Sequence, residues 1–167
     1  MEPRDILKVT PFFAEVLDDG EIDMLAARAR FISFPKGATP IEEDAPGHAM
    51  FVIVSGEALV GVHDEDEPVA RLGKGDIVGE MSLLTGARRS ATVTAATPLE
   101  VIEVNKEALA HVLKHAPDLV DRFAALIDRR QRELDRLAGG SAWGMLRMGQ
   151  AEMAATIRSF FGKTLID

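Results

Sequence analysis

The stretch GDIVGEMSLLTGARRSATV, residues 75–93, places one glutamate and two arginines around a short helical segment. Strand-type residues precede Gly79, and the strand-type run SATVTAA follows Arg89. The chain must therefore turn and return within about ten residues between two strands. The residues from Glu80 to Leu84 have good helix propensity. We predict a single helical turn that opens at Gly79 and Glu80.

Such a turn is suited to binding an anion. The first turn of a helix leaves backbone N–H groups unpaired along its axis, and these groups bind phosphates. Gly79 and the small Ser82 would let a ligand approach the backbone closely. An arginine that returns after the turn can bind the same phosphate through its planar guanidinium. Glu80 would repel a phosphate alone but can accept a hydrogen bond from a ribose hydroxyl. A ligand that holds a phosphate close to a ribose, as a cyclic mononucleotide does, satisfies both side chains.

The segment around this turn has the pattern of a β structure. From about residue 29, short β-branched or alternating runs are separated by glycines and prolines. This pattern is typical of an antiparallel sandwich or barrel. Within it, Ser55 and Gly56 predict a tight hairpin turn, and DEDEP at residues 64–68 predicts a solvated loop.

Helical patterns lie on both sides of this β segment. Residues 1–30 predict short helices, with a break at Pro11. Asn105 is suited to an N-cap, and the apolar spacing after it becomes helical. A longer helix begins near Asp118, and its apolar stripe contains Arg130. The full stripe is Leu119, Phe123, Ile127, Arg130, Leu134 and Leu137.

The last segment, residues 139–167, predicts a short amphipathic helix. Trp143 and the pair Phe160-Phe161 favour a docking face over a cofactor-binding box. The apolar positions at helical spacing are Met153, Ala154, Ile157, Phe160 and Phe161.

The composition excludes several classes of site and location. The absence of cysteine removes disulfides, thiolate zinc sites and cysteine-ligated clusters. A net charge of -8 argues against non-specific nucleic-acid binding. No apolar run approaches the roughly 20 residues of a membrane span, and the N-terminus lacks the features of a signal peptide. We expect a cytoplasmic chain that does not itself contact a membrane.

The sequence predicts neither an enzyme nor a metal centre. His111 and His115 share one helix face, but no carboxylate pattern accompanies them. A jelly-roll metal enzyme of the cupin type is the alternative from another class. It would need histidines and a carboxylate inside the barrel, which the predicted strands do not supply. A second alternative is a degenerate domain that has lost its ligand and serves only in assembly.

The quoted stretch resembles the phosphate-binding cassette of cyclic nucleotide-binding domains. This family includes catabolite activator proteins, protein kinase A regulatory subunits and cyclic nucleotide-gated channels. FPKGATPIEEDAPGHAMFVIVSGEALV, residues 34–60, is similar to the early strands of the family. The resemblance implies a mainly β fold with flanking helices, an eight-stranded antiparallel jelly-roll β-barrel with N-terminal and C-terminal helices. It divides the chain into an N-terminal helical segment (1–30), a binding core (31–104) with its cassette at 79–92, lid helices (105–138) and a tail (139–167).

Roles for individual residues follow from the matched positions of the cassette. The resemblance implies that Glu80 binds the ribose 2'-hydroxyl. Arg89, which precedes Ser-Ala-Thr as the family's arginine does, would bind the phosphate. Arg88 falls where many members have proline, and it would add only positive potential. Ser90 would add a hydroxyl to the phosphate or the base. Backbone contacts would come from Gly79, Met81, Ser82 and Ala91.

Two interpretations of Arg130 stay open. Its side chain could extend along the helix seam to water or pair with Glu133. Alternatively, the helix folds over the pocket and Arg130 stacks on the purine, as a residue of this helix does in some family members. The predicted site includes Arg130 on the second interpretation.

The resemblance further implies a regulatory sensor without catalytic activity or a cofactor other than its ligand. Members that favour cGMP often have threonine after the arginine. Ser90 stands here and permits either nucleotide; we favour cAMP and keep cGMP as an alternative. The segment after residue 139 is too short for a helix-turn-helix, so no nucleic-acid partner is expected. We expect either a stand-alone sensor or a regulatory domain excised from a larger protein, such as a bacterial channel or transporter. A homo-oligomer is left open.

Overall fold

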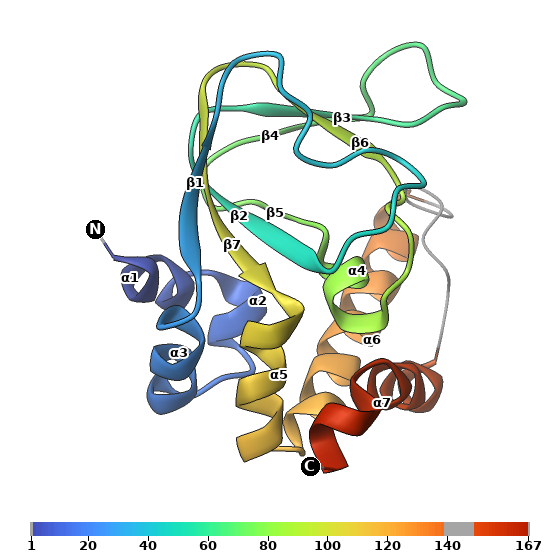
Figure 1. The fold of residues 1–167 in the computed structure, drawn as a ribbon. Coiled ribbons are helices and arrows are strands. Elements are labelled where there is room, and N and C mark those ends of the chain that lie inside the picture. Colours follow the sequence, from blue (N-terminus) through green and yellow to red (C-terminus); the bar gives the residue numbers. More distant parts are fainter. Residues whose placement is uncertain (1, 139–148, 167) are drawn as a thin grey trace.

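The protein places two antiparallel sheets above a layer of helices (Figure 1). This computed structural model describes residues 2–138 and 149–166, with side chains for 2–133 and 149–162. The helices are α1 (Pro3–Lys8), α2 (Pro11–Ala14), α3 (Asp19–Ala26), α4 (Glu80–Thr85), α5 (Lys106–His115), α6 (Leu119–Ala138) and α7 (Gln150–Ile166). The strands are β1 (Arg30–Phe34), β2 (Ala49–Ser55), β3 (Ala58–Gly61), β4 (Ala70–Leu72), β5 (Ile77–Val78), β6 (Thr92–Ala95) and β7 (Leu99–Asn105).

The two sheets confirm the predicted mainly β fold with flanking helices. The first sheet has the order β1-β7-β2-β5, and the second has the order β4-β3-β6. All pairs in them are antiparallel. Eight strands are predicted, and the described residues contain seven. Ile41 adds one isolated bridge to Val93 at the side of β6, where pairing is too short to form a further strand.

The predicted hairpin at Ser55 and Gly56 is wrong, because β2 and β3 belong to different sheets. Gly56 has a φ of 91°, so it lies in the left-handed region. A Cβ at this position would lie 2.2 Å from the carbonyl oxygen of Pro98. The turn therefore carries the chain from one sheet to the other and packs closely against the segment that leads into β7.

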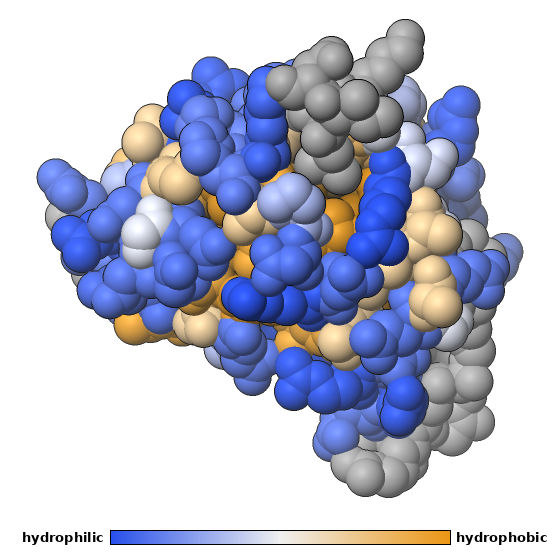
Figure 2. All heavy atoms as spheres, turned by 90° about the horizontal axis from the view of Figure 1, so that it is seen from below, coloured by the Kyte–Doolittle hydropathy of each residue, from blue (hydrophilic) through white to orange (hydrophobic). Residues whose placement is uncertain are grey.

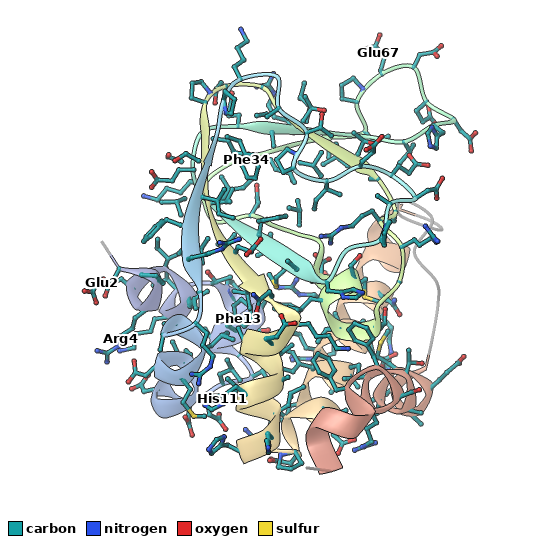
Figure 3. The ribbon with its side chains drawn as sticks, viewed as in Figure 1. Glu2, Arg4, Phe13, Phe34, Glu67 and His111 are labelled. Carbon is teal, nitrogen blue, oxygen red and sulfur yellow. The ribbon has the colours of Figure 1, made fainter. Side chains whose placement is uncertain are left out.

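The central strands are buried on both faces, which explains their continuous apolar runs. On β2, Met50 and Val52 pack into a core shared with the helices. Phe51 and Ile53 alternate with them and pack into a second core between the two sheets. In Figure 3, Phe13 lies in the helical layer, and Glu67 points into solvent from the loop between β3 and β4. The exposure of that loop confirms the predicted solvated DEDEP segment.

The helices begin and end where the sequence supplies caps. Asn105 caps α5 by accepting a hydrogen bond from the Ala108 N–H at 2.9 Å. Asp18 caps α3 in the same way through the Glu21 N–H. Seen from the helical side, the coloured surface is mostly hydrophilic, with hydrophobic residues visible between polar side chains (Figure 2). Each helix thus turns its apolar face towards the sheet or a neighbouring helix. None of the described helices has the length and apolarity needed to cross a bilayer.

Candidate functional site

A pocket of about 310 Å³ lies between α4 and the inner side of the second sheet. This volume is at the lower end of the range for small-molecule sites. Its apolar wall comes from Ile41, Val60 and Val93, which belong to or bridge the second sheet. The polar and small residues around it are Asp44, Gly79, Glu80, Ser82, Thr85, Arg88, Arg89 and Ser90. The pocket therefore combines an apolar surface for a flat ring with a charged end.

Helix α4 is the predicted helical turn, and it begins where the sequence places it. Gly79 is its N-cap, with a φ of 85° in the left-handed region. A side chain there would meet the Arg89 guanidinium, since a Cβ would lie 2.6 Å from Arg89 Nη1 and 2.9 Å from the Ala49 carbonyl oxygen. Glycine at this position is therefore required both by the backbone conformation and by the close approach of the arginine.

Arg89 is a buried cation held by the backbone around it. It is 7% exposed. Its N–H donates to the Ala45 carbonyl oxygen at 3.0 Å, and its own carbonyl oxygen accepts from the Asp44 N–H at 2.8 Å. The guanidinium Nη1 donates to the Gly79 carbonyl oxygen at 3.5 Å, the one hydrogen bond of this group within the described residues. Most of its five N–H donors are therefore available to an anion in the pocket.

Gly47 packs against the same guanidinium from the other side. A Cβ on Gly47 would lie 2.3 Å from Arg89 Nε and 2.5 Å from Arg89 Cζ. The arginine head thus passes between two glycines from separate loops. A side chain at either glycine would displace the charged group from its position beside α4.

Glu80 lies half-buried at the first position of α4 and lines the same pocket. Burial raises the pKa of the Glu80 carboxyl above its ordinary value, because desolvation disfavours the charged form. Its own backbone N–H and the charges of Arg130 and Arg89 oppose this rise in the pKa. Burial also lowers the pKa of the Arg89 guanidinium, and the charge of Glu80 opposes that change. The two groups are a partly desolvated pair of charges, unlike an exposed surface salt bridge.

Arg130 is not among the residues that line the pocket. Its guanidinium carbon is 5.4 Å from the centroid of the Phe12 ring, within the range of a cation–π contact. Its positive charge also acts on the Glu80 carboxyl. The structure therefore places the Arg130 guanidinium over Phe12 and not among the residues that line the pocket.

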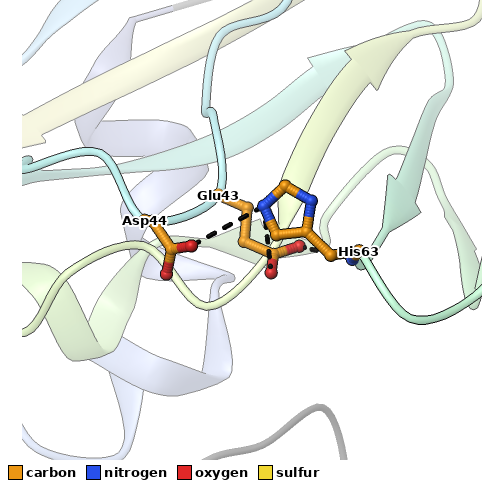
Figure 4. A group of neighbouring side chains, drawn as sticks. All are labelled: Glu43, Asp44 and His63. Carbon is orange, nitrogen blue, oxygen red and sulfur yellow. Dashed lines mark hydrogen bonds and ion pairs between the residues drawn. The ribbon is translucent and has the colours of Figure 1, made fainter.

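Arg88 and Asp44 line the pocket, and Glu43 and His63 lie beside Asp44. Arg88 is exposed, and its Nη1 donates to the Asp44 carbonyl oxygen at 2.8 Å. His63 Nε2 lies 3.5 Å from Glu43 Oε2 and 3.6 Å from Asp44 Oδ2 (Figure 4). The His63 N–H also donates to Glu43 Oε1 at 2.9 Å. These contacts tie the loop that carries Asp44 to the end of β3.

Among the described residues, one set of three side chains could hold a metal ion: Glu43, Asp44 and His63. It lies at the surface, with the side chains of His63 and Asp44 exposed by 68% and 75%. A cupin-like centre requires its ligands inside the barrel. The position of the group therefore gives that alternative no support.

The structure brings together seven of the eight predicted site residues. They are Gly79, Glu80, Met81, Ser82, Arg89, Ser90 and Ala91, and Arg130 is the exception. The sequence analysis missed Gly47 and the apolar wall of the pocket. In a single sequence, a glycine that packs against an arginine 42 positions away looks the same as any other turn glycine. Trp143 lies outside the described residues.

Comparisons with known proteins identify the family of this chain. A family model described as cyclic nucleotide-binding domain matches residues 31–116. A cAMP-dependent protein kinase regulatory subunit of Aspergillus fumigatus is 36% identical over 91 residues, which cover 54% of this chain and 22% of that protein. A cyclic AMP receptor protein of Thermus thermophilus is 29% identical over 132 residues, covering 77% of this chain and 61% of the relative. The chain thus spans less than two thirds of either curated relative.

Solved structures agree in fold. The N-terminal domain of a transcriptional regulator from Streptomyces coelicolor matches with a TM-score of 0.67 and 27% sequence identity, covering 79% of this chain and 96% of that one. A cyclic nucleotide-binding domain from Methylobacillus flagellatus matches with a TM-score of 0.66 at 24% identity, which concerns the fold alone. The matched family residues contain α4, Glu80 and Arg89, so the family match and the pocket coincide in the chain.

Proposed function

Because the chain belongs to the cyclic nucleotide-binding domain family, we propose that it binds a cyclic mononucleotide in this pocket, with cAMP preferred to cGMP. In this proposal the Arg89 guanidinium binds the cyclic phosphate and Glu80 accepts a hydrogen bond from the ribose 2'-hydroxyl. Ser90 adds a hydroxyl at the phosphate or the base. The backbone at Gly79, Met81, Ser82 and Ala91 surrounds the sugar and phosphate.

The buried position of Arg89 is the observation that supports this function most strongly. Transfer of a guanidinium out of water is costly unless an anion or several acceptors compensate for it. Within the described residues its hydrogen bond is long, at 3.5 Å. A singly charged cyclic phosphate would supply bidentate acceptors to the planar group. Neighbouring Glu80 would be repelled by a bare phosphate, so a ligand with an adjacent hydroxyl fits the pair better.

Signal transmission is proposed to run through α6, which follows the matched family residues. Ligand would draw the cassette and α6 together, and α6 would pass the change to an attached or partner effector such as a bacterial channel or transporter. Arg130 already lies near Glu80, so a small movement of α6 would bring it towards the base. This proposal includes a cytoplasmic location and no catalytic role.

A titration with cAMP and cGMP tests the function directly. We expect saturable binding of both by isothermal titration calorimetry, with the tighter affinity for cAMP. Hydrogen exchange of the α6 amides should slow when the preferred nucleotide is added, because closure lowers local opening. An absence of heat with either nucleotide would favour the degenerate alternative. Binding without any change in α6 exchange would reject the transmission step while leaving binding intact.

Replacing Gly47 by alanine tests how strictly the arginine must be placed. The new methyl group would displace the Arg89 head, so we expect about a three- to tenfold loss of cAMP affinity, equivalent to about 0.7–1.4 kcal/mol. The melting temperature should change little, because the group that moves is the end of a flexible side chain. Gly61→Ala is the matched control, since a Cβ at Gly61 has no atom within 4 Å. Equal affinity of both variants would show that the contact with Gly47 does not position Arg89.

A further inference from the structure

The C-terminal helix α7 contacts α4 at the C-terminal end of α4. Gly86 is the C-cap of α4, with a φ of 75° in the left-handed region. The ring of Phe160 lies against it, since a Cβ on Gly86 would lie 2.5 Å from Phe160 Cε1 and 2.7 Å from Phe160 Cδ1. This close approach needs a glycine. The same short helix therefore lines the pocket and meets α7 at its C-cap, Gly86.

Phe160 also contacts two other segments that border the site. The ammonium of Lys106, at the start of α5, lies 4.0 Å from the centroid of the Phe160 ring. The ring of His48 lies 5.4 Å away in an edge-to-face arrangement. His48 directly follows Gly47, which packs against the Arg89 head. One aromatic ring thus joins the end of α4, the start of α5 and the loop that holds the arginine.

Helix α7 is firmly docked in this position. Met153, Ile157 and Phe161 are each 0–1% exposed and belong to the core shared by the helices and the first sheet. On the outer side, Arg158 forms an ion pair with Asp121 of α6 at 2.8 Å. All of α7 lies beyond the residues that the family model matches, which end at 116. The contact with α4 is therefore made by a segment that the family match does not cover.

From these contacts we propose that α7 positions the nucleotide pocket, so that docking of Phe160 on Gly86 and binding of nucleotide in the pocket beside α4 favour each other. The inference rests on the proposed function. With six residues, α4 has little helical stability of its own, and its place depends on packing against β2 and α7. If α4 is already held in place, less conformational entropy is lost when the ligand binds, and the affinity is higher. Linkage requires that bound nucleotide stabilise the docked α7 by the same factor.

The first test compares Phe160→Ala with Ser159→Ala by calorimetry. Ser159 is exposed on the same helix and makes a matched control. We expect Phe160→Ala to weaken cAMP binding at least about fivefold and Ser159→Ala to leave it unchanged. Equal affinities in the two variants and the wild type would overturn the inference. Circular dichroism of each variant checks that the β fold is retained.

The second test needs no variant and covers the case in which Phe160→Ala fails to fold. Hydrogen exchange of the wild-type chain is measured with and without saturating cAMP. We expect slower exchange in residues 150–166 together with slower exchange in residues 79–90. Protection confined to residues 79–90 would overturn the coupling to α7 but leave the proposed function standing. If the wild type binds neither cAMP nor cGMP, the proposed function itself fails, and the inference fails with it.

Discussion

Arg89→Ala should lower the affinity for cAMP by about 30- to 5000-fold, which corresponds to the roughly 2–5 kcal/mol lost when one member of a buried charge pair is removed. The variant loses the phosphate partner and leaves the cyclic phosphate in a desolvated pocket. Because the guanidinium is itself costly to bury, the unliganded fold should not lose comparable stability. Calorimetric titration of the variant with cAMP and cGMP measures the effect.

The neighbouring arginine provides the control for this substitution. Arg88 is exposed and donates to the Asp44 carbonyl oxygen. Arg88→Ala removes the same charge from the same loop, so we expect a change of about threefold or less, as for a rim charge screened by solvent. If both variants lost affinity equally, general positive potential rather than a specific contact would explain binding. Unaltered binding by Arg89→Ala would rule out the assigned phosphate site.

Glu80→Leu should weaken cAMP binding about 10- to 150-fold. Leucine has a similar volume but cannot accept a hydrogen bond. A hydrogen bond to a charged group contributes about 1.5–3 kcal/mol, and the ribose hydroxyl would be left without its acceptor. A nucleotide that lacks the 2'-hydroxyl should bind the wild type and the variant with nearly equal affinity. If the wild type and Glu80→Leu differed in affinity for the 2'-deoxy nucleotide as much as for cAMP, the role assigned to Glu80 would be contradicted.

The same substitution should stabilise the unliganded protein at neutral pH. Burial raises the pKa of Glu80 above its ordinary value of 4.5, so the fold favours the protonated carboxyl. The protonated Glu80 carboxyl is compatible with burial, so the wild-type fold is most stable below the ordinary pKa. This stability is lost as the pH rises through the raised pKa and the buried carboxyl becomes charged. The excess stability of Glu80→Leu over the wild type should therefore grow from acid to neutral pH. Thermal unfolding without ligand over this range measures it, and Glu67→Leu in the exposed loop is the control. A difference that is independent of pH would contradict the raised pKa.

Local features of the fold could be predicted because they depend on neighbours in the sequence. The cap at Asn105 and the helical turn after Gly79 follow from side chains within a few positions. The hairpin at Ser55 and Gly56 was wrong for the opposite reason. A glycine turn looks the same whether its strands pair or enter different sheets, and here a close contact with the Pro98 backbone decides the outcome.

The candidate site was predicted where residues act through the cassette itself, and missed where distant segments meet. Gly47 and Arg89 are far apart in the sequence, and so are Gly86 and Phe160. Contacts of this kind depend on how loops close over one another, which periodicity does not report. The spacing of α6 predicted an inward position for Arg130. It could not predict that the long side chain would extend over the Phe12 ring and not line the pocket.

Successive side chains of β2 point into two different cores, so substitutions at successive positions should have different effects. Phe51 and Ile53 share a core with Val60, Ala91 and Val93, which line the pocket, whereas Met50 and Val52 share one with the helices. A mutational scan along this strand should alternate in phenotype from residue to residue. Changes at Phe51 or Ile53 would alter the affinity for the nucleotide. Changes at Met50 or Val52 would act indirectly, by loosening the core that these residues share with Leu83 and Leu84 of α4.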